Sequence, residues 1–443
     1  MSKPKPLKAI RGMNDTLPMD SARWSSIESH IADVVTLFGY QEIRTPVLES
    51  THLFARSMGA DTDIVSKEMY TFEDRNGDSL TLRPEGTAPC VRAGIEHGLL
   101  YNQQQRLWYK GPMFRHEHPQ KGRYRQFHQL GVECYGWSSA DIEAEVIDLA
   151  RCIFERLGLS GWRLEINSLG DTSSRAEYRT ALKSYFSAHF DALDADSQRR
   201  IETNPLRILD SKNAKTRAIA QGAPSILAFL SDESQQHFAD LQQSLTRLGI
   251  PFEVNPAMVR GLDYYNDTVF EFICDEFGAQ STVCGGGRYD GLVAQLGGHA
   301  TPAFGFGMGL ERLVQLLTEQ GHLTVLPNVS DVYLVSESGE CRLQALALRA
   351  ELIRSGIASS MTMGDASFKN QFKRADKSGA KIALVIGPDE LEASAVTLKW
   401  MGALPKPDTS DDWVCQLRAS DNQQIQVALI DVAEAVTNLL DSL

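Results

Sequence analysis

Three glycines stand two residues apart in the segment 305–309, at Gly305, Gly307 and Gly309. Residues two apart on a β-strand point to the same face of a sheet. One face of this expected strand would therefore be nearly bare of side chains, so that a flat ring could approach the backbone. A glycine-rich strand packed against a helix has the same pattern, and the glycines alone leave both interpretations open.

Arginines accompany this segment and two others. Arg312 follows the glycines within one turn of an expected helix, Arg115 stands in Phe-Arg-His-Glu at 114–117, and Arg260 opens Arg-Gly-Leu-Asp-Tyr-Tyr at 260–265. Arginine stays charged, and its planar fork matches phosphate oxygens two at a time. We interpret the three segments as a site that holds a polyphosphate beside a small polar substrate.

The segment 110–125 is basic, although the whole chain carries a formal net charge of −13. It contains five Lys or Arg residues and a single acid, Glu117, and its centre at 120–124 resembles a turn. A solvated basic loop is one interpretation. The other is that Arg115 reaches a phosphate while the loop meets a nucleic-acid backbone. In so acidic a chain, any nucleic-acid contact must come from a local patch of this kind.

Polar residues in three further segments could contact a ligand. Glu85 and Thr87 follow an expected strand, where a plain turn is equally compatible. Gln129 and Glu133 are four apart, so on a strand both face one side, and together they could read an amine and a ring N–H; a salt-bridged surface carboxylate is the common alternative. The segment 285–291, Gly-Gly-Gly-Arg-Tyr-Asp-Gly, permits close backbone approach or forms an ordinary turn.

Composition sets broad limits. The chain has 443 residues, with 42% hydrophobic and 23% charged, which indicates a globular protein of two or three domains. Its seven cysteines form no CxxC pair, so neither a zinc site nor a disulfide framework is indicated, and free thiols suit the cytoplasm. No secretory signal is visible, and no stretch approaches the roughly 20 apolar residues of a membrane-spanning helix.

Periodicity predicts a helix over 21–38 that stops at Gly39, and then a strand over 41–48. Pro46 cannot donate to a ladder, so this strand is expected at an edge or an interface. The residues 172–250 are rich in helix and are interpreted as an insertion in a core spanning 1–327. We also expect strands over 79–83, 107–110, 129–135 and 269–273 and a helix over 141–157.

A boundary is expected near 321–330, where Pro327 interrupts the pattern. Beyond it, expected strands over 332–335 and 382–387 alternate with a helix over 341–355, which predicts a compact α/β domain over 328–443. The chain contains no GxxxxGK[ST] loop, no strand-GxGxxG-helix with a trailing acid, and no Ser or Cys nucleophile motif.

Taken in order, these segments resemble the class II aminoacyl-tRNA synthetases, and specifically the bacterial histidyl-tRNA synthetases, over nearly the whole chain. The helix with the Pro46 strand is similar to the family's first motif, which forms the dimer interface. The second and third motifs resemble 114–133 and 305–312. The segments 260–265 and 285–291 resemble signatures specific to histidine. The resemblance implies an α+β fold, with an antiparallel sheet flanked by helices and an α/β anticodon-binding domain, in a homodimer.

The resemblance also implies the reaction: histidine and ATP give histidyl-adenylate, and histidine then passes to the 3′ end of tRNA(His). Arg115 and Arg260 would hold the α-phosphate, Arg312 would clamp the nucleotide near its γ-phosphate, and Arg123 would lie beside the nucleotide. Family members use Mg²⁺, and no metal site made of protein ligands alone is expected. His118 and Gln120 would lie in the loop that meets the acceptor end; the family usually has arginine at the position of His118.

Histidine would be recognised by a further group of residues that the same resemblance implies. Glu85 and Gln129 would receive its amino group, with Thr87 nearby. Glu133 and Tyr265 would read the imidazole, and Tyr264 and Tyr289 would line the pocket.

Two rival functions share this fold. A regulatory paralogue in histidine biosynthesis typically lacks the C-terminal domain and the histidine signatures, both of which are expected here. An amino-acid ligase that does not use tRNA would need neither the basic loop nor that domain. The basic run made of Lys369, Lys373, Arg374, Lys377 and Lys381 could supply anticodon contacts, or it could be a solvated helix face.

Overall fold

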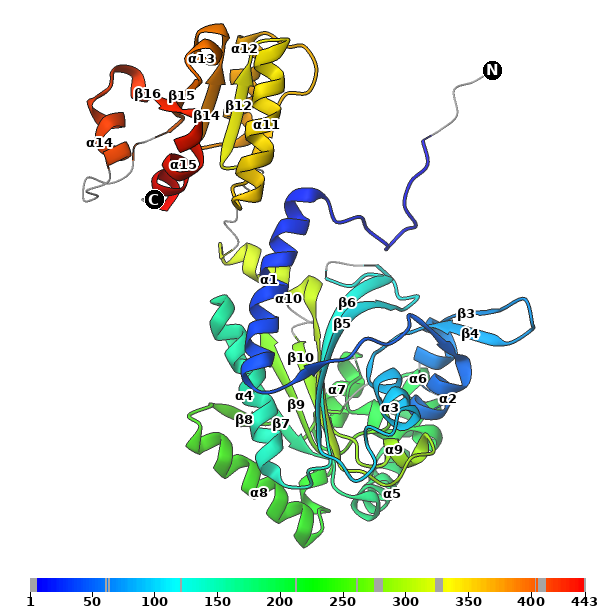
Figure 1. Ribbon diagram of the computed structural model, residues 1–443. Coiled ribbons are helices and arrows are strands. Elements are labelled where there is room, and N and C mark those ends of the chain that lie inside the picture. The colour runs from blue at the N-terminus through cyan, green and yellow to red at the C-terminus, as the bar shows by residue number, and fades with distance from the viewer. Residues whose placement is uncertain are drawn as a thin grey trace, which may run out of the picture. The chain divides into compact units, whose positions relative to one another are not determined.

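The computed structural model describes residues 6–59, 62, 64–119, 122–211, 213–259, 262–274, 282–322, 330–402, 404 and 412–441. The chain divides into two compact units, Met1–Val325 and Leu326–Leu443 (Figure 1). In the described residues no helix has both the length and the apolar character needed to cross a membrane.

An eight-stranded sheet forms the centre of the first unit, in the order β1-β5-β6-β11-β10-β9-β7-β8. The pairings from β5 to β7 are antiparallel, and only the edge strands β1 and β8 pair in parallel, which confirms the predicted antiparallel sheet. The strands are β1 (Gln41–Glu42), β5 (Gln105–Phe114), β6 (Gln126–Tyr135), β7 (Trp162–Ser168), β8 (Phe252–Val254), β9 (Asn266–Cys274), β10 (Thr282–Arg288) and β11 (Ala303–Gly309).

The predicted strand over 41–48 was wrong, because this stretch is split between two sheets. After β1 the chain leaves the large sheet, and β2 (Leu48–Ser50) joins a three-stranded sheet with β4 (Ser79–Leu82) and β3 (Tyr70–Glu73). The buried guanidinium of Arg83 donates to the Thr45 carbonyl at 3.0 Å, and Pro46 has no N–H to give, so the backbone between the strands cannot continue a ladder.

The two faces of the large sheet carry different cores. On β6 and β11 the side chains alternate, and Leu130, Val132, Phe304 and Phe306 all point into one hydrophobic cluster. Helices α1 (Pro18–Leu37), α4 (Ala140–Leu157), α8 (Asp232–Arg247) and α10 (Leu310–Glu319) cover this face. Helices α2 (Thr51–Met58), α3 (Thr87–Glu96) and α9 (Leu292–Gln295) lie on the other side (Figure 1).

The stretch interpreted as an insertion has a small core of its own. Buried side chains from Tyr178 to Leu230 form that cluster, which includes α5 (Thr172–Ala188) and α6 (Ala195–Thr203). Helix α8 is different, because its apolar side chains Phe238, Leu241 and Leu245 belong to the main core beneath the sheet.

The second unit is the α/β domain that the alternating pattern predicted. Its five-stranded sheet has the order β13-β12-β14-β15-β16. The pairs β13–β12 and β12–β14 are parallel, and the pairs β14–β15 and β15–β16 are antiparallel. The strands are β12 (Val332–Ser336), β13 (Ser359–Met361), β14 (Ile382–Ile386), β15 (Ala395–Trp400) and β16 (Gln424–Ala428). The main helices are α11 (Glu340–Arg354), α12 (Phe368–Ser378), α14 (Asp412–Ala419) and α15 (Val432–Asp441).

Candidate active site

A cavity of about 700 Å³ opens on the sheet face opposite α1 and α4. Its volume is that of a site for a small ligand or cofactor. It is lined by parts of β6, β9, β10 and β11 and by the loop between β5 and β6. Eight residues singled out from the sequence line it: Glu85, Thr87, Arg115, Arg123, Gln129, Tyr264, Tyr265 and Arg312.

The other candidates lie elsewhere. Glu133 and Tyr289 are almost fully buried behind the cavity wall. Glu133 contacts Thr87, and Tyr289 contacts Tyr264, both of which line the cavity. His118 is exposed on the β5–β6 loop and does not line the cavity. Arg260 and Gln120 lie outside the described residues.

The glycine-spaced strand is β11, followed at once by α10, as the sequence predicted. Its glycine face is not bare, and that expectation was wrong. A side chain on Gly305 would meet the carboxylate of Glu133, and one on Gly307 would meet the amide of Gln129. The missing side chains therefore make room for two polar groups of the neighbouring strand β6, and only Gly307 and Gly309 face the cavity itself.

Glu133 is held by three hydroxyl groups. Thr87 Oγ1 donates to its Oε1 at 2.7 Å, Tyr109 Oη donates to the same oxygen at 3.0 Å, and Tyr289 Oη donates to Oε2. Burial raises the pKa of Glu133 to about 8, and the charge of Glu85 adds to the rise while the hydroxyls oppose it. An approaching ring N–H would find an acceptor that is already fixed in position.

Tyr109 is a buried partner of Glu133 that the sequence analysis missed. Its ring fills the space next to Gly86 and Gly131, where no side chain could be accommodated. Gly131 stands between Gln129 and Glu133 on the same face of β6. A glycine between two polar candidates could have indicated that a large side chain fills the space beside it. A large side chain from a neighbouring strand had to cover it.

Glu85 lies at the start of α3, where the first backbone N–H groups of the helix have no partner within the helix. It accepts from the Thr87 N–H at 2.7 Å and from the Ala88 N–H at 2.8 Å. Burial raises its pKa, while these hydrogen bonds and the nearby Arg115 pull the pKa down. The helix N-terminus thus holds a carboxylate at the cavity wall, where it could accept from an ammonium group.

Three arginines lie close to one another on the cavity wall. Arg115 Nε donates to the Pro84 carbonyl at 2.8 Å, and Arg123 forms an ion pair of 3.0 Å with Glu117. Arg312 donates to the carbonyl of Thr282. Burial lowers the pKa of Arg312, and the charges of Arg123 and Arg115 lower it further, which shows that the three cations are close enough to repel one another. A polyanion would relieve that repulsion.

The three predicted tyrosines form one cluster. The ring centroids of Tyr264 and Tyr265 are 4.8 Å apart, and that of Tyr289 lies 5.7 Å from the first and 6.5 Å from the second. Tyr289 joins the cluster to Glu133 through its hydroxyl, and the faces and edges of such rings suit a flat polar ligand.

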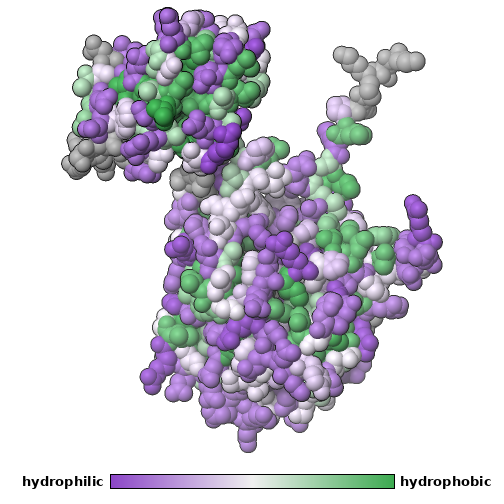
Figure 2. Space-filling model, in the orientation of Figure 1, coloured by the Kyte–Doolittle hydropathy of each residue, from purple (hydrophilic) through white to green (hydrophobic). Residues whose placement is uncertain are grey.

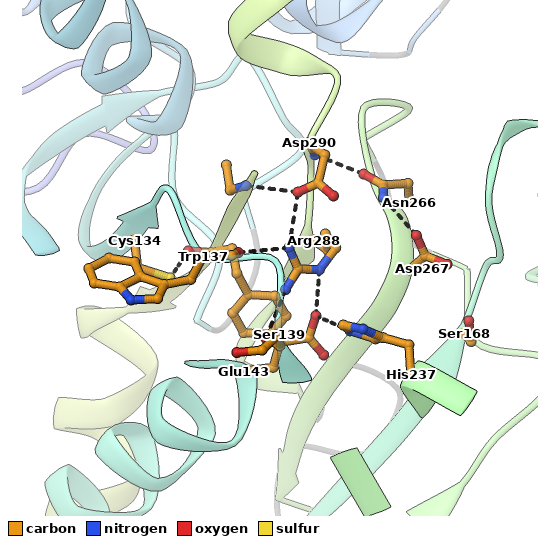
Figure 3. Close-up of polar contacts among 12 residues, drawn as sticks. Cys134, Trp137, Ser139, Glu143, Ser168, His237, Asn266, Asp267, Arg288 and Asp290 are labelled. Carbon is orange, nitrogen blue, oxygen red and sulfur yellow. Dashed lines mark hydrogen bonds and ion pairs between the residues drawn. The ribbon is translucent and has the colours of Figure 1, made fainter. Parts of the chain in front are cut away.

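A buried charge network fixes the chain on both sides of Tyr289 (Figure 3). Arg288 Nε donates to Glu143 at 2.5 Å, and Arg288 Nη1 donates to Asp290 at 3.1 Å. His237 of α8 forms a hydrogen bond of 2.8 Å with the same Glu143 oxygen. Although burial acts against it, Arg288 and His237 hold the pKa of Glu143 below its ordinary value. The ionised network anchors the backbone from which Tyr289 points toward Glu133.

Two acids face each other across β7 and β9 at the cavity wall. Glu165 and Glu271 are directly opposite in the antiparallel register. Among the described residues no group of three His, Cys, Asp or Glu could hold a metal ion alone. One or two carboxylates together with substrate phosphates are the usual ligands of Mg²⁺, and Glu271 lies close enough to Arg312 to affect its pKa. The donor set therefore fits a cation that a nucleotide brings with it.

Comparison with known proteins agrees with this geometry. Residues 12–313 match the family model of histidyl-tRNA synthetase, and residues 331–439 match that of an anticodon binding domain. The crystal structure of apo histidyl-tRNA synthetase from S. aureus is 36% identical, covers 97% of this chain and 99% of that chain, and superposes with a TM-score of 0.79.

Two more distant structures share the fold. Histidyl-tRNA synthetase from Nostoc sp. PCC 7120 is 21% identical, with a TM-score of 0.68 over 98% of this chain and 100% of that chain. A Bacillus halodurans protein described as an ATP phosphoribosyltransferase regulatory subunit/histidyl-tRNA synthetase is 24% identical, with a TM-score of 0.62 over 87% of this chain and 99% of that chain.

The fold, the matched domains and the cavity together define an aminoacyl-tRNA ligase, an enzyme. Within that class, the chain belongs to the histidyl-tRNA synthetase family. Membership implies binding of tRNA, histidine and ATP, with ATP as a substrate.

Proposed function

We propose that the chain activates L-histidine with ATP to histidyl-adenylate, and then transfers histidine to the 3′ end of tRNA(His), releasing AMP and pyrophosphate. The observation that carries this proposal is the polar lining of one cavity. Arg115, Arg123 and Arg312 lie close to one another on its wall, and Glu85, Gln129, Tyr264 and Tyr265 line the same cavity.

The first step needs no protein base. The carboxylate of histidine is ionised at neutral pH and attacks the α-phosphorus directly. Catalysis then consists of positioning the reactants and neutralising the charge that builds on the phosphate. Arg115 and Arg260 take that role at the α-phosphate, Arg123 lies beside the nucleotide, and Arg312 holds the end near the γ-phosphate.

Recognition of histidine relies on hydrogen bonds. Glu85 and Gln129, with Thr87, receive the amino group, and Glu133 and Tyr265 read the imidazole. Because Glu133 is buried and already oriented by hydroxyls, an amino acid without a ring N–H would leave it without that partner. Sites built this way can discriminate by ~10⁴ or more.

Mg²⁺ would be held by Glu271, with Glu165 opposite, together with the phosphates of the nucleotide. When bound, it supplies positive charge that shares the neutralisation of the phosphates with the arginines.

Two parts of the chain would meet tRNA. The loop between β5 and β6, with His118 and Gln120, would meet the acceptor end. In the second unit, α12 exposes four cations that could contact the anticodon through charge, although a solvated helix face has the same composition. These are Lys369, Lys373, Arg374 and Lys377.

A homodimer through α1 and the Pro46 segment completes the proposal, with each surface meeting its own copy. Large apolar side chains are exposed along this part of the chain, including Leu37, Val47 and Leu48. Figure 2 shows hydrophobic residues among the hydrophilic ones on the visible face of the first unit. Light scattering should give about twice the chain mass of 49.1 kDa. A fully active monomer at micromolar concentration would contradict the dimer.

Aminoacylation tests the function directly. Total tRNA, ATP and one labelled amino acid at a time should give charged tRNA with histidine alone, and the charged species should be tRNA(His). The regulatory rival predicts no charging, and the ligase that does not use tRNA predicts adenylate formation with histidine but no labelled tRNA.

A further inference from the structure

A short loop carries the tyrosines of the histidine pocket. Residues 262–265 form bends and turns before β9 begins at Asn266. Loops are positioned by what holds them, because they lack the ladder of a strand. Among the described residues, two side chains of the helical insertion make polar contacts with this loop.

Arg175 on α5 makes the closer contact. Its Nη1 donates to the main-chain carbonyl of Tyr265 at 2.7 Å. Arg207 makes the other, with its Nη2 lying 3.9 Å from the Asp263 carboxylate. A cavity of about 30 Å³ between insertion and loop is lined by both arginines, so apolar packing alone does not fill this boundary.

The start of α5 is itself fixed to the chain next to Tyr265. Beyond the β7–β9 pairing, the Leu169 N–H donates to the Asp267 carbonyl at 2.7 Å and the Asp267 N–H to the Gly170 carbonyl at 3.0 Å. Asp171 then caps the helix by accepting from the Ser174 N–H at 2.8 Å. Arg175 lies one turn further along α5 and donates to the Tyr265 carbonyl. The fixed start of the helix therefore fixes the position of the Arg175 side chain.

We propose that Arg175 is a positioning residue for histidine recognition: through the Tyr265 carbonyl it sets the place of the Tyr264–Tyr265 pair on the cavity wall. Arg207 supports the same loop through Asp263. The helical insertion is then part of the amino-acid specificity of the enzyme. This inference rests on the proposed activation of histidine.

The test compares two arginines of the same helix. Arg175→Met keeps the length of the side chain and removes its donors, and Arg175→Lys keeps the charge. Arg179→Met is the matched control, because the exposed Arg179 lies one turn further along α5 and donates to a carbonyl inside the insertion, that of Thr203. Histidine-dependent and ATP-dependent pyrophosphate exchange are measured separately for each variant.

Arg175→Met should raise the KM for histidine about 10-fold, the lower end for losing one hydrogen bond from a charged donor, and should change the KM for ATP less than about twofold. The KM for histidine of Arg175→Lys should lie between those of Arg175→Met and the wild type. Both KM values of Arg179→Met should match those of the wild type. If the Met variant does not fold, the Lys variant carries the test with the same measurements.

A double-mutant cycle separates positioning from general loss of stability. In a Tyr265→Phe background, where the phenol that reads the ring is gone, Arg175→Met should raise the KM for histidine much less than it does alone. Equal effects in both backgrounds, or a parallel rise of both KM values, would overturn the inference. A wild type without histidine-dependent exchange would instead contradict the proposed function.

Discussion

The carboxylate of Glu133 occupies the space that a side chain on Gly305 would need. The two residues are direct partners in the β6–β11 register, so neither can move away without disturbing the sheet. A side chain at 305 would meet both the Glu133 carboxylate and the Val132 carbonyl, so the glycine makes room for the neighbouring strand β6.

Gly305→Ala should destabilise the fold by roughly 1–3 kcal/mol, the usual cost of overpacking, and should raise the KM for histidine because Glu133 is displaced. Gly309→Ala is the steric control, since its added carbon would meet nothing nearer than Arg312 Cδ at 4.0 Å. Thermal unfolding and pyrophosphate exchange measure both effects. Equal stability losses in the two variants would show that the glycine at 305 has no special role.

Glu133 should also make stability depend on pH. Its pKa is about 8 in the folded chain, above the ordinary carboxyl value of 4.5. The folded protein therefore holds an extra proton between pH 4.5 and pH 8, and this contribution to stability is lost as the pH rises through that window. The amide of Glu133→Gln does not titrate, so the variant does not lose this stability as the pH rises.

The Tm difference between wild type and Glu133→Gln, measured at pH 5, 6.5 and 8, isolates this group because Glu85 is present in both proteins. Between pH 5 and pH 8 the free energy of unfolding of the wild type should fall by up to about 4 kcal/mol relative to that of the variant, at 1.36 kcal/mol for each unit of pKa. The Tm of the wild type should fall with it. A Tm difference that does not vary with pH would show that Glu133 stays ionised throughout.

Arg260→His should reduce formation of histidyl-adenylate at least ~100-fold, the usual scale for removing one donor to a transition state. Folding should be little affected, because the sequence gives this arginine no packing role. Pyrophosphate exchange and circular dichroism measure the two properties. Near-normal exchange would remove Arg260 from the mechanism.

Local patterns predicted much of this structure. Helix α1 and the strand-to-helix turn at Gly309 were visible because burial follows the periods of 3.6 and 2. The break at Pro46 was not, since it depends on Arg83, a residue distant in sequence that takes the Thr45 carbonyl. The order of strands in the sheet was not predicted, and the family resemblance supplied only that the sheet is antiparallel and flanked by helices.

The candidate site shows the same division. The sequence predicted that Gln129 and Glu133 share one face of a strand. It did not predict the burial of Glu133, because burial depends on the side chains that other strands place over it. Tyr109 was missed for this reason. The supporting contact from Arg175 to Tyr265 joins residues 90 positions apart and leaves no local signal.

One cavity that holds histidine at the Glu133 end and ATP at the arginine end is the central claim. The most direct test measures the KM values for histidine and ATP, by pyrophosphate exchange above pH 8 where Glu133 is ionised, in three variants. The KM for histidine should rise in the order wild type, Glu133→Gln, Glu133→Ala, because the amide keeps one acceptor oxygen and alanine keeps none, at a cost of roughly 1–3 kcal/mol. Arg312→Gln should raise the KM for ATP and spare that for histidine. If the Glu133 variants raise the ATP value and spare the histidine value, the two ends of the site have been assigned in reverse.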